Sequence, residues 1–228
     1  MLTQLSLPKW PESGKSTILK IQSNTHGTGT MFDKILQFER ALAEFTGAPY
    51  AIMTDCCTHA IEMCLRYDQV KHCKMQPYTY LSIPMTMHKL GIEYEYLDHA
   101  WQRWVGEYPF LETRIWDSAR RLEQDMYRPD TLTCLSFGHG KPLHIGRGGA
   151  ILLDDVEAYD TMLAQRYDGR DLTIKPWESQ QVFRVGYHYK PTIEEAQQGL
   201  ALLEGVKVNR PTPVHVDYPD LRKIKIIP

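Results

Sequence analysis

Short apolar runs alternate with amphipathic segments through most of the chain, and this alternation limits the possible fold more than any other feature. Residues 31–47 carry one apolar helical face and end at Gly47, which predicts a helix with a glycine stop. The apolar run 49–55 predicts a strand, and it leads into a buried helix expected to begin near Thr58. A helix, a strand and a second helix therefore follow in order.

The same order of elements continues along the chain. Further strands are expected near 73–77, 92–98, 113–119, 131–137 and 148–155, and further helices after Pro84, at 156–167 and at 192–205. Strands that alternate with helices favour an α/β fold, here a three-layer sandwich with a mainly parallel central sheet.

Length and composition divide the chain into three expected parts. The 228 residues, 43% of them hydrophobic, are enough for one sizeable core. Residues 1–30 are rich in Pro, Gly, Ser and Thr and predict an irregular N-terminal arm. Residues 31–205 then form one large domain, and residues 206–228 a short C-terminal arm.

The charge balance and the cysteines bound the class of protein. Lys and Arg number 26 against 28 Asp and Glu, a net charge of -2 that gives no support for a nucleic-acid or anionic membrane partner. No stretch is long and apolar enough to span a bilayer, and the first residues lack a signal-peptide pattern. Five cysteines without CxxC spacing indicate neither a disulfide framework nor a metal site. We expect a cytoplasmic protein.

A single lysine, Lys141, lies in a loop of glycines and histidines between two expected strands. An amine that attacks a carbonyl needs a fixed position and partial desolvation, although a solvated loop lysine is the commoner case. Asp117 ends another expected strand, at the sheet edge where α/β proteins gather their ligands. The pair is therefore a candidate site.

Pyridoxal 5′-phosphate (PLP) requires a lysine for its Schiff base, a carboxylate opposite the pyridine nitrogen and a phosphate cradle. Lys141 and Asp117 meet the first two needs. The helix start at 56–58 offers backbone N–H groups to an anion, and Ser136 can add a hydroxyl donor. Each feature also has a plain alternative: Asp117 can cap a helix, and Ser136 can bond the local backbone.

Five stretches of the sequence, in order, resemble the DegT/DnrJ/EryC1/StrS family of PLP-dependent enzymes, best known as aminotransferases of nucleotide-linked keto sugars. They lie at 38–65, 76–98, 115–120, 136–152 and 186–204. The stretch "SFGHGKPLHIGRGGAIL" aligns on the family pattern without a gap and places Lys141 on the Schiff-base lysine. The resemblance implies the large domain of a fold type I, aspartate aminotransferase-like transferase, with the small C-terminal domain largely missing.

The resemblance also implies roles around the cofactor ring. Lys141 would form the Schiff base and then move protons on the substrate, and Asp117 would keep the pyridine nitrogen protonated. Tyr80 would stack on the ring. Arg120 replaces the usual glutamine of the family motif and brings a fixed positive charge near the ring, while Arg147 replaces a glutamate.

Around the phosphate, the resemblance implies that backbone groups of Cys57 and Thr58 hold the anion together with Ser136. Cys56 and Cys57 replace the usual Ser-Gly pair and add bulk there. His188 occupies the position of an asparagine that reaches the phosphate from the neighbouring subunit. A homodimer with shared active sites follows from that role.

The function expected from these residues is that of a PLP-dependent aminotransferase. An amino-acid donor, often glutamate in the family, would supply the amino group to a keto or aldehyde acceptor such as a nucleotide-linked sugar. Two alternatives stay open: a degenerate, non-catalytic binding or scaffolding subunit, and another PLP reaction such as elimination or decarboxylation.

Overall fold

The computed structural model describes residues 31–98, 104–172, 174, 176–206 and 218–227. The expected arm at residues 1–30 lies outside this part of the chain. The helices are α2 (Met31–Thr46), α3 (Cys57–Tyr67), α4 (Ser82–Leu90), α5 (Val156–Gln165) and α6 (Ile193–Leu203), with short 3-10 turns η2 (Trp177–Ser179) and η4 (Leu221–Lys223). The strands are β1 (Tyr50–Thr54), β2 (His72–Met75), β3 (Glu93–Tyr96), β4 (Tyr108–Pro109), β5 (Ile115–Asp117), β6 (Leu132–Ser136) and β7 (Gly149–Leu153).

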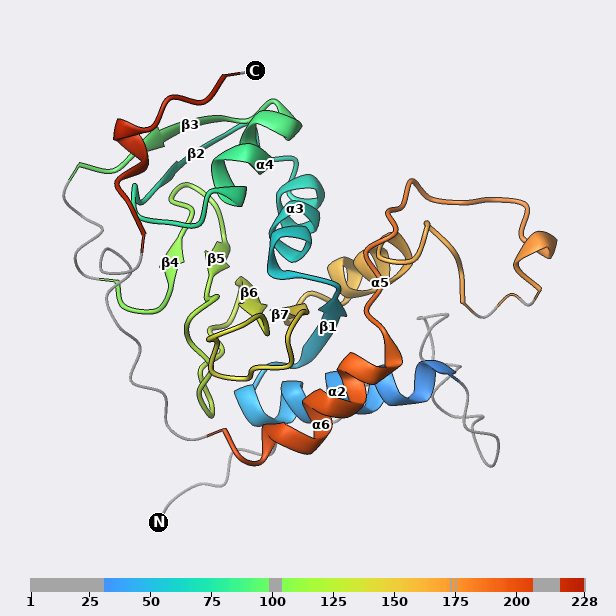
Figure 1. Cartoon of the computed structure of the whole chain (residues 1–228). Coiled ribbons are helices and arrows are strands. Elements are labelled where there is room, and N and C mark those ends of the chain that lie inside the picture. The colour runs from blue at the N-terminus through green and yellow to red at the C-terminus, as the bar shows by residue number, and fades with distance from the viewer. Residues whose placement is uncertain (1–30, 99–103, 173, 175, 207–217, 228) are drawn as a thin grey trace, which may run out of the picture.

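Three layers form the body of the described chain, as the sequence predicts. Helices α2 and α6 lie side by side on one face of the sheet, and α3 and α5 lie on the other (Figure 1). Successive residues of β1 alternate between the two faces: Ala51 and Met53 pack toward α2, whereas Tyr50 and Ile52 pack toward α3 and α5. This alternation gives the molecule two hydrophobic cores, one on each side of the sheet.

The central sheet is mixed. Within the described residues its strand order is β1-β7-β6-β5-β4. Strands β1, β5 and β6 share one direction, but β7 and β4 run against their neighbours, and only the β5–β6 pair in this sheet is parallel. A separate parallel pair is formed by β2 and β3.

The prediction of a mainly parallel sheet is therefore wrong for the pairing of neighbouring strands. Parallel neighbours need a long crossover, usually a helix, but β6 returns into β7 through the helix-free loop 137–148. That loop carries Lys141. The same return that reverses β7 thus holds the lysine at the edge of the sheet.

The buried interior includes one ion pair. Glu39 of α2 and Arg166, just after α5, are both almost fully buried and form a salt bridge. Arg166 also donates to the carbonyl oxygen of Met53 at 2.6 Å, and the N–H of Met53 donates to Glu39 at 2.6 Å. Burial raises the pKa of Glu39, although Arg166 opposes this shift. The pair ties two helices to β1.

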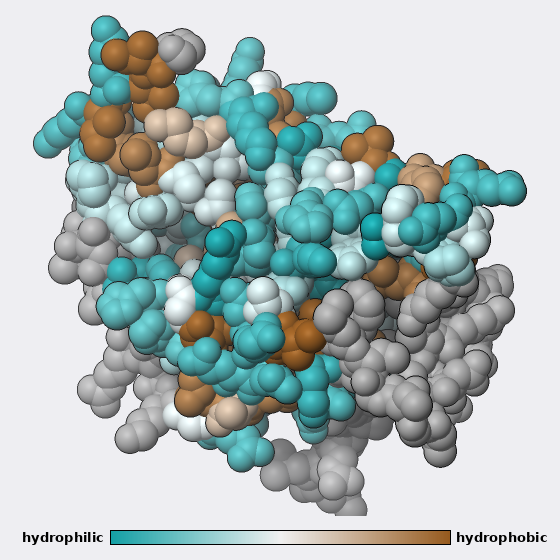
Figure 2. Space-filling model, turned by 45° about the vertical axis from the view of Figure 1, so that its right-hand side comes forward, coloured by the Kyte–Doolittle hydropathy of each residue, from teal (hydrophilic) through white to brown (hydrophobic). Residues whose placement is uncertain are grey.

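The surface facing the viewer in Figure 2 is mainly hydrophilic, with hydrophobic residues in separate groups. Among the described helices, none is both long and apolar enough to cross a membrane.

Candidate active site

A cavity of about 410 Å³ opens where β5 and β6 end, beside the first turn of α3. Seven of the eight predicted site residues line it, and they come from five separate parts of the chain: Cys57, Thr58, Tyr80, Asp117, Arg120, Ser136 and Lys141. The volume lies in the range of small-molecule sites. The cavity is therefore the candidate active site.

Lys141 reaches the cavity from the loop between β6 and β7. Its backbone N–H donates to the carbonyl of Gly138 at 3.3 Å, which closes a tight turn. Gly140, just before it, has φ +72°, a conformation that favours glycine. The side chain of Lys141 is half-buried, and its positive charge acts on both Asp117 and Cys57. The lysine is thus partly desolvated, and its charge interacts with that of the Asp117 carboxyl group.

Asp117 is the buried acid of the cavity, with 6% of its surface exposed. Burial raises its pKa, against the lowering effects of the Ala119 N–H, the Tyr108 hydroxyl and Lys141. The Ala119 N–H donates to its Oδ1 at 2.9 Å. Tyr108 lies opposite Asp117 on β4, and its hydroxyl also meets Thr79 at 2.7 Å. A buried carboxylate of this kind is stabilised by a cation placed in the cavity.

The N-terminus of α3 forms another part of the lining. Its N-cap residue Cys56 is extended and accepts no side-chain capping hydrogen bond from the first turn. The backbone N–H groups of Cys57 and Thr58 begin this helix, where the dipole favours an anion. The Thr58 hydroxyl also meets the Ser82 hydroxyl at 2.8 Å. This end of the cavity suits a phosphate group.

Gly149 brings β7 close to this helix start. A Cβ atom at Gly149 would lie 2.4 Å from the backbone nitrogen of Cys57, closer than real Cβ atoms approach. Gly149 pairs with Ser136 on β6, so the serine hydroxyl belongs to the same corner of the cavity. The absence of a side chain at Gly149 therefore allows the sheet and the α3 N-terminus to meet.

These features fit PLP. A half-buried lysine, a buried carboxylate and an uncapped helix N-terminus line one cavity, and each matches a different part of the cofactor. Cys56 and Cys57 are bulkier than a Ser-Gly pair, but the cavity that they line together with Lys141 still has a volume of about 410 Å³.

Two of the predicted site residues, Tyr80 and His188, are largely exposed to solvent. Tyr80 lines the cavity from the turn before α4, and 61% of its surface is exposed. His188 does not line the cavity. Its side chain is 70% exposed and lies 3.1 Å from the carboxylate of Asp168. The structure therefore does not bring His188 together with the other seven residues.

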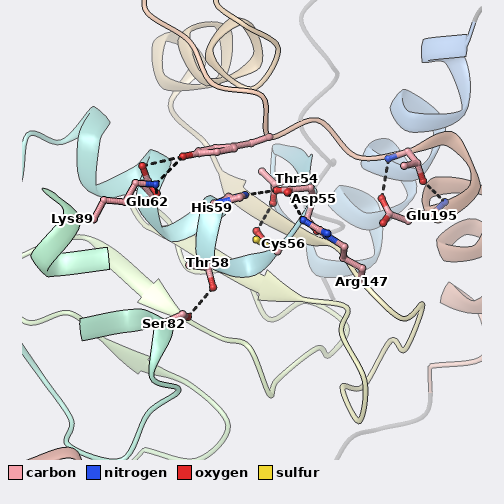
Figure 3. A network of polar contacts seen from close by, with 12 residues as sticks. Thr54, Asp55, Cys56, Thr58, His59, Glu62, Ser82, Lys89, Arg147 and Glu195 are labelled. Atoms are coloured by element: carbon pink, nitrogen blue, oxygen red, sulfur yellow. Dashed lines mark hydrogen bonds and ion pairs between the residues drawn. The ribbon is translucent and has the colours of Figure 1, made fainter. Parts of the chain in front are cut away.

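A polar network at the rim of the cavity was not among the predicted site residues (Figure 3). Arg147 donates to Asp55 at 2.7 Å, and Asp55 accepts a hydrogen bond from His59 at 2.6 Å. The His59 ring stacks on Tyr189, with ring centroids 3.7 Å apart. The network continues to Glu62, which accepts from the Tyr189 hydroxyl at 3.1 Å. The sequence does contain one signal for this network: Asp55 and His59 are four residues apart at a helix start, a spacing that brings side chains together.

The network fixes charges beside the α3 N-terminus. Burial disfavours a charged His59, but its bonds to Asp55 and Cys56 outweigh burial and raise the pKa of His59 to about 9. Burial likewise opposes ionisation of Asp55, and hydrogen bonds from His59 and Arg147 hold the pKa of Asp55 below its ordinary value. Arg147, which replaces the family glutamate, thus pairs with a carboxylate of this chain.

Asp55, Cys56 and His59 also place three potential metal ligands within 4.8 Å of one another. Both carboxylate oxygens of Asp55 are already used, one by His59 and the other by Arg147. A cation there would have to displace the proton of His59 and lie next to a guanidinium. The arrangement therefore favours an internal ion-pair network over a metal centre.

A comparison with protein-family profiles identifies one family. The sequence matches the profile of the DegT/DnrJ/EryC1/StrS aminotransferase family over residues 15–110 and 124–211. No curated protein sequence gives a significant match.

Solved structures share the fold at low sequence identity. AtS13 from Actinomadura melliaura is 19% identical with a TM-score of 0.64, and the match covers 83% of this chain and 64% of that protein. The sugar aminotransferase CalS13 from Micromonospora echinospora is 15% identical with a TM-score of 0.62 and the same coverage. A DegT DnrJ EryC1 StrS aminotransferase from Brucella abortus is 18% identical with a TM-score of 0.60, covering 83% and 63%. The chain thus spans somewhat less than two thirds of the length of these relatives.

Proposed function

The chain belongs to the DegT/DnrJ/EryC1/StrS aminotransferase family, and from this premise we propose that it is a PLP-dependent aminotransferase. It would move an amino group from an amino-acid donor to a keto or aldehyde acceptor. The observation that carries the proposal is the meeting of Lys141, Asp117 and the α3 N-terminus in one cavity. The similarity to the sugar aminotransferase CalS13 supports a sugar as the class of acceptor.

Each residue of the cavity has a task that its surroundings support. When bound, PLP supplies an electron sink for the bonds of the substrate carbon. Lys141 anchors the cofactor and moves a proton through its Nζ, because it is half-buried and borders the cavity. The buried carboxyl group of Asp117 would hold a positive charge at the pyridine nitrogen. The N–H groups of Cys57 and Thr58, with the Ser136 hydroxyl, bind the phosphate.

The remaining predicted residues surround this centre. Arg120 and Tyr80 both line the cavity, and we propose that the ring of Tyr80 packs on the bound cofactor. We propose that the protein is a homodimer and that His188 serves the site of the second subunit. Its exposed position outside its own cavity is compatible with that task.

The proposal is tested by the donor half-reaction, which needs no knowledge of the acceptor. Purified protein loaded with PLP is mixed with single amino acids, glutamate first, and pyridoxamine 5′-phosphate is measured by chromatography. We expect stoichiometric formation by the wild type and none by Lys141→Ala. Lys71→Ala removes an exposed lysine that does not line the cavity, and we expect this control to react like the wild type.

Other outcomes select among the alternatives. Release of carbon dioxide or of a β-substituent from the donor, without pyridoxamine 5′-phosphate, would replace transfer by decarboxylation or elimination. A protein that stays folded but acts on no donor and binds no PLP would contradict the proposal and favour a scaffolding subunit.

A further inference from the structure

The C-terminal segment 218–227 contributes one of the aromatic residues that line the cavity. Tyr218 lines the same cavity as Lys141 and Asp117, although it lies far from both in the sequence. Figure 1 shows this segment beside β2 and β3, on the side of the molecule where β4 lies. Tyr218 lies beyond the family-like stretches, which end at residue 204.

The segment that carries Tyr218 is held in place by specific contacts. Leu221 is buried, with 4% of its surface exposed, and its N–H donates to the carbonyl of Pro77 at 3.0 Å. Asp220 caps the short turn η4 by accepting from the Arg222 N–H at 3.1 Å and from its guanidinium at 2.8 Å. Pro77 opens the turn that leads to Tyr80. One backbone contact therefore links the two segments that bear Tyr80 and Tyr218.

The two tyrosine rings meet edge to face. Their centroids are 6.2 Å apart and their planes are inclined by 61°. Tyr80 is 61% exposed, and within the described residues the ring of Tyr218 is its aromatic neighbour. An exposed aromatic side chain loses rotamer freedom when a ligand packs on it. A neighbour that orders the ring beforehand lowers this cost, and an aromatic pair of this geometry adds its own attraction.

We propose that Tyr218 is a positioning residue of the cavity: its edge fixes the ring of Tyr80 so that Tyr80 can pack on the planar ring of a bound pyridoxal-type ligand. The inference rests on the proposed function for the choice of ligand. The contact needs the ring of Tyr218 and not its hydroxyl, which separates Tyr218→Phe from Tyr218→Ala.

The test measures binding of pyridoxamine 5′-phosphate, which needs no covalent bond to Lys141. We expect Tyr218→Ala to weaken binding by about 3- to 10-fold, the range for one aromatic pair. Tyr218→Phe and the control Ile227→Ala, an exposed residue of the same segment, should bind like the wild type. If Tyr218→Ala does not fold, Tyr218→Leu keeps the bulk without the aromatic edge and should show the same loss.

A double variant separates positioning from a direct contact. If Tyr218 acts through Tyr80, then Tyr80→Ala combined with Tyr218→Ala should bind no more weakly than Tyr80→Ala alone. Additive losses, or unchanged binding in Tyr218→Ala, would overturn the inference. A wild type that binds pyridoxamine 5′-phosphate but never bonds PLP would instead refute the proposed function and leave this comparison valid.

A second readout needs no ligand. Hydrogen exchange of the free protein should be faster at the amides around Tyr80 in Tyr218→Ala than in Ile227→Ala, because the restraint on that turn is lost. Equal exchange in the two variants would contradict the inference, even for a protein that fails to bind the probe.

Discussion

Replacing His59 by Gln should remove a dependence of stability on pH between about pH 6.5 and 9. The pKa of His59 in the folded protein is about 9, above its ordinary value of 6.5. The folded state therefore binds the proton more tightly than the unfolded state. The resulting stabilisation is fully present below pH 6.5 and is lost as the pH rises through 9.

The size of the effect follows from the shift and from the exposure of the ring. A shift from 6.5 to about 9 sets an upper bound of about 3 to 4 kcal/mol on the contribution of His59 protonation to the free energy of unfolding. The side chain of His59 is 27% exposed, and its partner Asp55 also bonds Arg147, so solvent screening and shared charge reduce the value. We expect about 1 to 2 kcal/mol between pH 6 and pH 9.5.

The assay is urea unfolding of the wild type and of His59→Gln at pH 6 and pH 9.5. The difference between the two proteins cancels the titration of all other groups to first order. Loss of stacking on Tyr189 lowers the stability of the variant equally at both pH values. Asp55→Asn, which keeps the imidazole but removes its carboxylate partner, should reduce the pH dependence without abolishing it, because Cys56 also raises the pKa of His59. An advantage of the wild type that is the same at both pH values would refute the reasoning.

Three further predictions concern the scaffold and the cavity. Arg166→Met leaves Glu39 buried without its partner and should lower the free energy of unfolding by about 3 to 5 kcal/mol in urea titrations. Gly149→Ala forces a methyl group against the Cys57 backbone; it should cost about 1 to 3 kcal/mol and weaken binding of pyridoxamine 5′-phosphate. In the native protein Cys56 should react first with a disulfide reagent, as mapped by mass spectrometry, because it borders the cavity beside charged His59.

Matched comparisons make these predictions decisive. Gly138→Ala places its methyl group 3.7 Å from the Ser136 hydroxyl, an ordinary contact, and should change stability far less than Gly149→Ala. Equal losses in the two glycine variants would contradict the close approach at β7. Burial raises the pKa values of the thiols of Cys57, Cys73 and Cys134, so faster labelling of any of these would contradict the assignment of Cys56.

Helices and strands of this fold could be predicted where the pattern of apolar residues within the segment itself determines its structure. Helix α2 and strand β1 lie within a residue or two of the expected ranges, because their apolar faces decide their structure. Strand β4, only Tyr108–Pro109, was not predicted, since two residues carry no period. The direction of β7 was missed because it depends on the loop that returns from β6, and not on the strand itself.

In the candidate site too, some residues could be placed from the sequence, and others only from the fold. Lys141, Asp117 and Ser136 could be placed together from sequence, because strand ends at one sheet edge and an ungapped family motif both point to them. The pairing of Arg147 with Asp55 joins residues 92 positions apart, and no local pattern contains it. Tyr218 was likewise beyond sequence reasoning, since only the return of the C-terminal segment brings it to Tyr80.

The measurement that tests the central claim most directly is the identification of the residue that bonds PLP. The protein is incubated with PLP, reduced with borohydride and digested, and the modified peptide is mapped by mass spectrometry. The account predicts one adduct, on Lys141, that is absent from Lys141→Ala. No adduct on the folded protein, or an adduct mainly on another lysine, would contradict it.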